Sequence, residues 1–330
     1  MRRRRVAIGA VAALVVLGLW LANASDLAPV DASARPRVLS HRGVHQTYDP
    51  RGVGSDTCTA ARIRPPRHRY LENTLPSMRA AFAAGAEVVE LDVHLTPDRV
   101  FAVFHDWRLD CRTNGAGVTE RTPWPVLQTL DVAHGYTADG GRSFPLRGSG
   151  VGQMPRLEAV FDAFPGRRFL INFKSNRAEE GAALAALLGA YPRYRTQVFG
   201  VYGGGPPTGA AMAQAPGLRG YTRASLQRCL VPYLLIGWSG AVPGPCRGQI
   251  IAVPENLAWL LWGWPARFEK RMRQVGSDVI LVGPLGGEGF TAGLDTPQAV
   301  ARIPRRFTGY VWTNTVETTG PLIRDRRAGS

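Results

Sequence analysis

The sequence has little cysteine and no motif for a metal–thiolate or redox centre. Only four of the 330 residues are cysteines, and none stands in the C-x-x-C spacing of a zinc or redox site. In an oxidising compartment such cysteines pair, so we expect two structural disulfides. Three pairings are open. We favour Cys58–Cys111, which would join loops that follow predicted strands, and Cys229–Cys246, which would close a short local loop.

Signatures of nucleic-acid and dinucleotide binding are also missing. No helix-turn-helix, finger or aromatic RNA-binding pattern occurs, and no Gly-rich dinucleotide fingerprint. Gly203-Gly204-Gly205 is followed by two prolines and no Lys-Ser/Thr, so we interpret it as an ordinary turn. Net charge is +15, mostly from scattered arginines, and +11 remains once Arg2 to Arg5 are set aside. This balance fits an exported protein that meets anionic surfaces or substrates.

Long apolar runs are absent after the N-terminus. Val6–Ala22 is apolar throughout, follows four arginines and leads into Ala22-Asn23-Ala24, the A-x-A pattern of a signal-peptidase site. The run is long for a signal peptide and short for a spanning helix, so both a signal peptide and an uncleaved anchor stay open for residues 1–24. We expect residues 25–37 to be a linker and residues 38–330 to be one exported domain, periplasmic or otherwise outside the cytoplasm.

Strands and helices alternate through that domain. Nine segments are strand candidates: Val38–Ser40, Val88–Val93, Val100–Phe104, Phe169–Phe173, Gln197–Tyr202, Leu218–Thr222, Ile250–Val253, Val279–Val282 and Gly309–Trp312. Helices are predicted from Pro76, capped by Asn73 or Thr74 and stopping at Gly85, and at Leu157–Phe164, Ala178–Ala190 and Pro265–Val275. The alternation predicts a parallel sheet and, at about eight units, a (β/α)₈ TIM barrel. We expect one of Leu218–Thr222 and Ile250–Val253 to lie outside it, and a doubly wound open sheet is the alternative.

Two histidines and two acids stand at the ends of these apolar segments. Glu90 and Asp92 are two residues apart on a strand, so they project from the same face. Adjacent carboxylates repel unless a cation lies between them, and oxygen ligands favour Ca²⁺ or Mg²⁺. Taken alone, such a pair is more often a solvated strand face, and a lone His41 or His105 more often a hydrogen-bonding residue. Their joint position at carboxyl ends of strands predicts a site that binds a metal and transfers protons.

The chain resembles the glycerophosphodiester phosphodiesterase family, whose barrel is shared with phosphatidylinositol-specific phospholipases C. The resemblance covers residues 38 to about 176, the first half of the barrel, and is only loose beyond. It rests on His41-Arg42-Gly43, Glu72-Asn73-Thr74, Val89-Glu90-Leu91-Asp92-Val93, Thr96-Pro97-Asp98, His105-Asp106 and Met154-Pro155-x-Leu157-Glu158. It implies hydrolysis of glycerophosphodiesters to sn-glycerol 3-phosphate and an alcohol, with one divalent cation, Ca²⁺ or Mg²⁺.

The resemblance also implies roles for individual residues. His41 and His105 match the family's acid–base pair, and Glu90 and Asp92 its metal ligands. Arg42 and Lys174 stand where the family contacts phosphate, and Glu72 where it lines the site. Asn172 replaces the glutamate that normally completes the metal site. An amide oxygen still ligates Ca²⁺ or Mg²⁺, so we expect weaker metal binding, and the alternative is a site that has lost its metal.

Further signals from aromatic residues and histidines are weaker. Trp312 ends a late strand, where it would form an apolar wall of the site or pack in the core. His94 is interpreted as a rim residue, and His45, His68 and His134 as loop residues without a catalytic role. The cluster of Trp259, Trp262 and Trp264 suits a buried helix-loop or an apolar patch that touches lipid.

Three functional classes therefore stay open. The first is a phosphodiesterase of soluble glycerophosphodiesters. The second cleaves a lysophospholipid or sphingolipid at a membrane surface, in the manner of a lysophospholipase D or sphingomyelinase D. The third is a barrel that binds without catalysis. We expect a phosphodiester ligand, leave contact with a membrane surface open, and see no sign of a nucleic-acid or protein partner.

Overall fold

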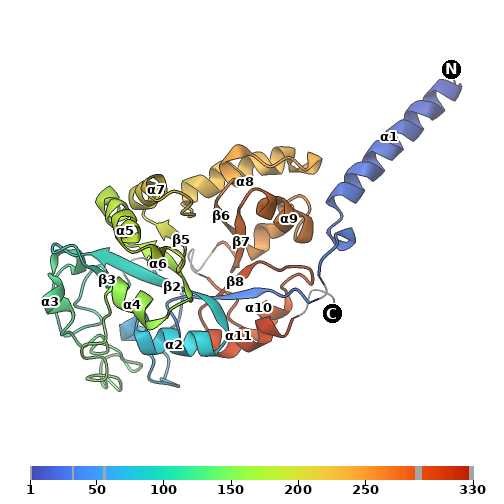
Figure 1. Ribbon diagram of the computed structural model, residues 1–330. Helices are drawn as coiled ribbons and strands as arrows, with labels where there is room; N and C mark the ends of the chain where they lie inside the picture. The colour runs from blue at the N-terminus through green and yellow to red at the C-terminus, as the bar shows by residue number, and fades with distance from the viewer. Residues whose placement is uncertain (1, 32, 55–56, 287–291, 327–330) are drawn as a thin grey trace.

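A parallel barrel forms the centre of the protein (Figure 1). The computed structural model describes residues 2–31, 33–54, 57–286 and 292–326. Neighbouring strands pair in parallel in the order β5-β4-β2-β1-β8-β7-β6. These strands are β1 (Arg37–Ser40), β2 (Ala86–Leu95), β4 (Arg168–Phe173), β5 (Val198–Gly203), β6 (Ile250–Pro254), β7 (Asp278–Val282) and β8 (Tyr310–Thr313).

The segment around Gly220 closes the barrel between β5 and β6. Gly220 pairs in parallel with Val201, and the Ile250 amide donates to the Gly220 carbonyl at 3.2 Å. Both Leu218–Thr222 and Ile250–Val253 thus belong to the barrel, and our expectation that one lies outside is wrong. The extra strand is β3 (Phe101–Val103), which pairs antiparallel with β2. Its connection from β2 is too short for the crossover that a parallel strand needs.

Helices surround the barrel (Figure 1). They are α2 (Leu75–Ala83), α4 (Leu157–Ala163), α5 (Ala178–Ala190), α7 (Gly205–Gln214), α8 (Arg223–Ile236), α9 (Ala266–Gln274), α10 (Pro297–Ala301) and α11 (Val316–Arg324), with the short α3 (Trp124–Leu127) and α6 (Pro192–Arg195). Thr74 caps α2 by accepting from the Ser77 amide, and the helix ends just before Gly85, whose φ is +101°. The helix predicted from Pro76 is therefore confirmed.

The long loops on one side of the barrel have a core of their own. Apolar side chains from residues 60–71 and 101–154 pack together and are buried, among them Ile63, Phe104, Leu109 and Tyr136. The Cys58–Cys111 disulfide joins the two loops, and Cys229–Cys246 joins α8 to the turn before β6. Both predicted pairings are confirmed. The first fixes the loop that follows β3, which carries several polar residues of the site.

The N-terminal helix α1 (Arg2–Asn23) projects away from the barrel (Figure 1). At its end the Asn23 side-chain amide donates to the Trp238 carbonyl at 2.8 Å, and Arg271 donates to Asn23 Oδ1 at 3.1 Å. Within the described part of the chain, no helix is long and apolar enough to cross a membrane. The division into residues 1–24, 25–37 and 38–330 stays a prediction.

Candidate functional site at the carboxyl ends of the strands

A tight turn after β1 brings two site residues to the carboxyl end of the barrel. His41 follows β1, and its amide donates to the Thr313 carbonyl of β8 at 3.0 Å. Arg42 then adopts a φ of +56°, in the left-handed region that a residue with a side chain rarely occupies. Its amide holds this geometry by donating to Glu90 Oε2 at 3.1 Å. The next residue is Gly43, which suits the position because its φ is +78° and a Cβ there would lie 2.9 Å from the Ser77 backbone.

Asp92 is the best-bonded acid of the site. It is fully buried, and its Oδ2 accepts from Asn73 Nδ2 at 2.9 Å and pairs with Arg42 Nε at 3.1 Å. Its Oδ1 accepts from Asn172 Nδ2 at 2.8 Å and lies 3.7 Å from Lys174 Nζ. Burial alone would raise the pKa of Asp92. The positive charges of Arg42 and Lys174 outweigh burial and hold that pKa well below its usual range.

Glu90 faces the same interior but has fewer positive neighbours. Its Oε1 accepts from the Tyr202 hydroxyl at 2.7 Å, and its Oε2 lies 3.7 Å from His41 Nε2. Burial first, and then the charge of Asp92, raise the pKa of Glu90 to about 8. The two predicted carboxylates therefore lie side by side, with one ionised and the other resisting ionisation.

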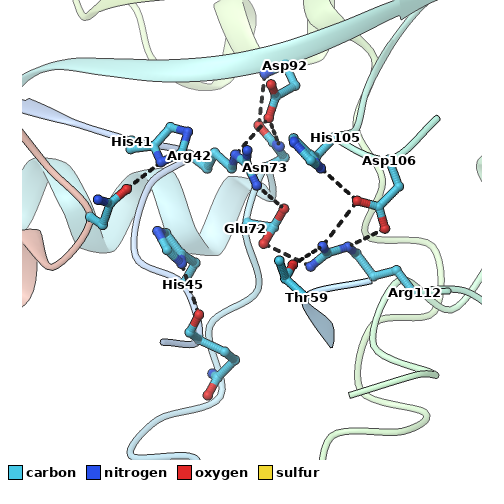
Figure 2. A network of polar contacts seen from close by, with 12 residues as sticks. His41, Arg42, His45, Thr59, Glu72, Asn73, Asp92, His105, Asp106 and Arg112 are labelled. Atoms are coloured by element: carbon cyan, nitrogen blue, oxygen red, sulfur yellow. Dashed lines mark hydrogen bonds and ion pairs between the residues drawn. The ribbon is translucent and has the colours of Figure 1, made fainter. Parts of the chain in front are cut away.

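His105 is held by a chain of charged contacts that runs to Arg42 (Figure 2). His105 Nδ1 lies 2.7 Å from Asp106 Oδ1, and Asp106 Oδ2 accepts from Arg112 Nε at 3.0 Å. The other end of Arg112 pairs with Glu72 Oε2 at 2.8 Å. Glu72 Oε1 in turn accepts from Arg42 Nη1 at 3.1 Å. Glu72 thus supports the site by holding two arginines in place.

Arg112 is a site residue that the sequence did not reveal. It is among the largest fully buried side chains, and it also donates to Thr59 Oγ1 at 3.0 Å. Thr59 and Arg112 each directly follow a cysteine of the Cys58–Cys111 disulfide, so this bond fixes both ends of the contact. One weak indication of its role was present in the sequence: Arg112 is a charged residue in a segment whose apolar side chains form the core of the loops.

His41 has its own orienting contact on the other side of Arg42 (Figure 2). Its Nδ1 lies 2.5 Å from Asn314 Oδ1, and the Asn314 amide nitrogen donates to Asp295 Oδ2 at 2.7 Å. Because Asn314 presents its oxygen, His41 carries its proton on Nδ1 and turns an unprotonated Nε2 towards the site. Asn314 and Asp295 were not predicted as site residues.

Trp312 on β8 forms a wall beside His41. The two ring centroids are 4.9 Å apart, and Trp312 is buried. Two further histidines, His94 and His45, are buried near the site. His94 is fully buried against the His105 carbonyl at 3.4 Å, so its interpretation as a rim residue is wrong. His45 is also buried, 6.0 Å from the His41 ring, and lines the cleft.

Burial lowers the pKa of both candidate catalytic histidines. For His41 the cause is burial first and then the charge of Arg42, and the pKa falls well below 6.5. For His105, burial and the charges of Arg42 and Lys174 outweigh the opposing effects of Asp92 and Asp106. Both imidazoles are therefore neutral near pH 7 before a ligand binds.

A cleft of about 1910 Å³ opens above these residues. Arg42, His105, Asn172 and Lys174 line it directly, together with parts of the segments 45–68 and 284–299. Glu90 and Asp92 lie below its floor and are fully buried. All of the predicted site residues are therefore brought to one place, with the cationic groups at the surface of the cleft and the acids beneath.

The donor set fits a hard cation in chemical type. Glu90, Asp92 and the oxygen of Asn172 are oxygen ligands of the kind that Ca²⁺ and Mg²⁺ prefer. Across the described residues, no group of three or more His, Cys, Asp or Glu side chains is placed to hold a metal. At position 172 the side chain is an amide. The network contains four carboxyl groups and three cationic side chains: Glu72, Glu90, Asp92 and Asp106 with Arg42, Arg112 and Lys174. Because the pKa of Glu90 is raised to about 8, a cation would take the place of the Glu90 proton.

A parallel barrel that gathers buried histidines, acids and arginines at this rim has the architecture of an enzyme. Residues 41–185 match the model of the Glycerophosphoryl diester phosphodiesterase family. The resemblance to that family is thereby confirmed over this segment, which is less than half of the chain. The match includes every predicted site residue except Trp312.

Known proteins with similar sequences point the same way. A glycerophosphodiester phosphodiesterase of Bacillus altitudinis is 32% identical over 106 residues, 32% of this chain and 40% of the relative. The human lysophospholipase D GDPD3 is 32% identical over 150 residues, 42% of this chain and 44% of the relative. The chain thus spans about two fifths of the length of the relatives that it matches.

Solved structures extend the likeness to the whole barrel. The glycerophosphoryl diester phosphodiesterase domain of a Mycobacterium tuberculosis protein superposes with a TM-score of 0.60 at 18% identity, covering 87% of this chain and 99% of that one. A glycerophosphodiester phosphodiesterase from Agrobacterium tumefaciens gives 0.54 at 21% identity, covering 86% and 97%. At these identities the likeness concerns the fold.

Proposed function

We propose that the protein hydrolyses glycerophosphodiesters to sn-glycerol 3-phosphate and an alcohol. One observation carries this proposal: His41 and His105 lie on either side of Arg42, each with its Nδ1 fixed by a neighbour (Figure 2). Two imidazoles around a cationic centre suit a displacement at phosphorus, in which one oxygen loses a proton as another gains one. Such a pair contributes roughly 10²–10⁴-fold to a rate.

Arg42 and Lys174 are the groups that bind the phosphodiester. Both line the cleft, and both are anchored to Asp92, so their charges are fixed before the substrate arrives. A phosphodiester carries one negative charge, and more charge gathers on its non-bridging oxygens as the reaction proceeds. Preorganised cations at that position stabilise the transition state more than the ground state.

The two histidines take different roles because their partners differ. His105 is paired with the carboxylate of Asp106, which stabilises an imidazolium, whereas the partner of His41 is the neutral amide of Asn314. His41 therefore acts as the base and removes a proton from the attacking hydroxyl or water. That oxygen bonds to phosphorus, the bond from phosphorus to the alcohol oxygen breaks, and His105 protonates the departing alkoxide.

A divalent cation, Ca²⁺ or Mg²⁺, completes the proposed site. Glu90, Asp92 and the Asn172 oxygen would hold it, and when bound it supplies positive charge next to the phosphoryl oxygens. Without the cation, Glu90 keeps its proton near pH 7, and three ionised carboxylates balance three cationic side chains. A divalent cation that displaced the Glu90 proton would leave the network, with both histidines neutral, at one positive charge. That charge matches a monoanionic phosphodiester.

A second candidate is the cleavage of lysophospholipids at a membrane surface. Two observations favour it: the matched human relative bears the name lysophospholipase D, and Trp259 next to β6 is 75% exposed. A lipid substrate would place its phosphodiester in the cleft and its acyl chain against an apolar surface nearby.

A substrate panel tests both candidates. Glycerophosphocholine and glycerophosphoethanolamine in solution are compared with lysophosphatidylcholine in vesicles, each with EDTA and then with Ca²⁺ or Mg²⁺. We expect turnover that EDTA abolishes and the cations restore. His41→Ala and His105→Ala remove it, while His134→Ala, which alters a partly exposed side chain that does not line the cleft, retains it. If no phosphodiester is hydrolysed under any of these conditions, the remaining function is binding without catalysis.

The proposed place of action is outside the cytoplasm. Both disulfides lie within the barrel domain, and structural disulfides persist in oxidising compartments. Together with the export pattern of residues 1–24, they support a periplasmic or extracytoplasmic protein.

A further inference from the structure

The outer face of α8 is apolar where a barrel helix is normally polar. Its inner face packs against the barrel through Cys229 and Tyr233, which are fully buried. On the opposite face Val231, Leu234 and Leu235 are exposed, Leu235 to 71%. A helix on the surface of a globular protein carries polar side chains on the side away from the core. The outer face of α8 has no such polar side chains in its second half.

Three tryptophans extend this face. Trp238 follows α8 directly and is exposed. Trp262 is exposed too, and its indole nitrogen donates to the Leu234 carbonyl at 2.9 Å, which holds it against the helix. Trp259 lies in the short turn Glu255–Leu260 after β6. We call these residues together the α8 apolar surface: Val231, Leu234, Leu235, Trp238, Trp259 and Trp262.

The α8 apolar surface connects two other parts of the molecule. At one end, Trp238 contacts the last turn of α1, where Trp20 and Leu21 are exposed. At the other end, the Asn256 side chain donates to the Leu285 carbonyl and accepts from the Leu285 amide. The neighbours of Leu285 in the chain, Pro284 and Gly286, line the cleft. Figure 1 shows α1 leaving the barrel on the side of α8 and α9. Polar contacts thus connect the segments that carry the α8 apolar surface to the projecting helix at one end and to the rim of the cleft at the other.

The stretch of chain that carries α8 has basic side chains and no acidic ones. Residues 181–254 contain no aspartate and no glutamate, but they include six arginines: Arg193, Arg195, Arg219, Arg223, Arg228 and Arg247. Arg223 and Arg228 are exposed on α8 itself. A second copy of the chain would bring equal charges together, which disfavours self-association through this face. A partner with negative charge and an apolar interior suits it better.

We propose that the α8 apolar surface docks the protein onto an anionic phospholipid bilayer. Tryptophan prefers the boundary between lipid head groups and acyl chains, where leucine and valine side chains reach the apolar layer. Arginines beside them pair with anionic head groups. Docking in this orientation turns the cleft rim near Leu285 towards the membrane. The proposal concerns binding only and does not rest on the hydrolytic activity.

A fluorescent probe on α8 tests this contact separately from any contact of α1. All four native cysteines are paired, so Leu235→Cys offers a single thiol for bimane in the full-length protein. Val126→Cys is the matched control, because Val126 is exposed on α3, on the far side of the barrel from α1 in Figure 1. Far-UV circular dichroism and Tm establish that both labelled proteins are folded.

The expected result is a blue shift of the probe at position 235 with vesicles of phosphatidylglycerol and phosphatidylcholine. The shift should be reversed by salt and be absent at position 126. Arg223→Gln with Arg228→Gln should weaken the vesicle titration by roughly an order of magnitude. Three outcomes overturn the proposal: no shift at position 235, an equal shift with phosphatidylcholine alone, or a shift that follows protein concentration without vesicles, which indicates a second copy.

Discussion

His105 Nδ1 lies 2.7 Å from Oδ1 of Asp106, the residue that follows it in the chain. A carboxylate accepts hydrogen bonds, so this contact places the His105 proton on Nδ1 and leaves Nε2 for the substrate. Asp106 is held in turn by two nitrogens of Arg112, at 3.0 and 3.2 Å. The reactive nitrogen of His105 is thus set by a residue that need not touch the substrate.

Asp106→Asn should lower kcat by roughly 10²–10⁴-fold with little change in KM. An amide that turns its NH₂ group towards His105 Nδ1 forces the proton onto the other nitrogen, and an amide does not stabilise an imidazolium. Arg112 keeps its ion pair with Glu72, so the protein should stay folded. Steady-state kinetics on glycerophosphocholine and a Tm measurement check both parts. Asp110→Asn, in the same loop and exposed, is the control. Equal kcat for both variants would mean that Asp106 does not orient His105.

The pH dependence of kcat/KM and of kcat should differ. In the free protein burial lowers the pKa of both histidines from 6.5, and His41 must be neutral while His105 holds a proton. The profile of kcat/KM reports the free protein, so its optimum should lie below pH 6.5. A bound phosphodiester places a negative charge near His105 and raises its pKa. The optimum of kcat should therefore lie at higher pH than that of kcat/KM, and coincident optima would contradict the assignment of the two roles.

Asn172→Asp should make the site depend more strongly on a divalent cation. Asn172 Nδ2 donates to Asp92 Oδ1 at 2.8 Å, and an aspartate there would bring two carboxylates together. We expect a lower Tm in EDTA than for the wild type, and a larger rise in Tm with Ca²⁺ or Mg²⁺. The apparent affinity for the cation should increase roughly tenfold or more, because one negative charge is added among the ligands.

Asn256→Asp is the control for this change, since Asn256 is exposed and bonded to Leu285 instead of Asp92. A Tm that rises equally with the cation in wild type and both variants would mean that position 172 does not contribute to cation binding. If the cation raises the Tm of Asn172→Asp but not that of the wild type, the wild-type site does not bind a metal.

Local patterns in the sequence were sufficient to predict most strands and helices and the site residues that lie on them. The helix Ala178–Ala190 has the predicted bounds, and His41, Glu90 and Asp92 meet because carboxyl ends of parallel strands share one rim. The helices α7 and α8 were not predicted, although Thr222 and Ser225 form a capping box at the start of α8. The sequence also could not reveal that β3 turns back antiparallel, since an apolar run does not encode its direction.

The supporting residues of the site were harder to predict because their partners come from separate loops. Arg112 meets Glu72 and Asp106 only after the Cys58–Cys111 loops have packed, and no sequence period marks such a contact. The same holds for Asn314 beside His41. Each of the two interpretations of the tryptophan cluster fits part of it. Trp264 packs against Phe268, as expected for a buried helix-loop, whereas Trp259 and Trp262 are exposed, as expected for an apolar patch.

Glu269 on α9 should make stability depend on pH. It is buried, and its Oε2 accepts from the Thr308 amide at 3.0 Å and the Thr308 hydroxyl at 2.9 Å. Its ion pair with Arg273 is weak, since Arg273 Nη1 lies 3.8 Å from Oε2 and the arginine is half exposed. Burial outweighs these contacts and raises the pKa of Glu269 to about 7 from 4.5. The folded state therefore binds this proton more tightly than the unfolded state does.

This contribution to stability is fully present below about pH 4.5 and is lost as the pH rises through about 7. The loss amounts to roughly 3 kcal/mol of the free energy of unfolding. Glu269→Gln imitates the protonated side chain, so the variant should gain stability relative to the wild type as the pH rises across this window. Urea unfolding of both proteins, repeated at intervals of about one pH unit between pH 4 and pH 8, measures the difference in their free energies of unfolding. Glu179→Gln, exposed on α5, should show no such trend. Parallel curves for Glu269→Gln and the wild type would mean that the buried carboxyl group titrates as it does in water.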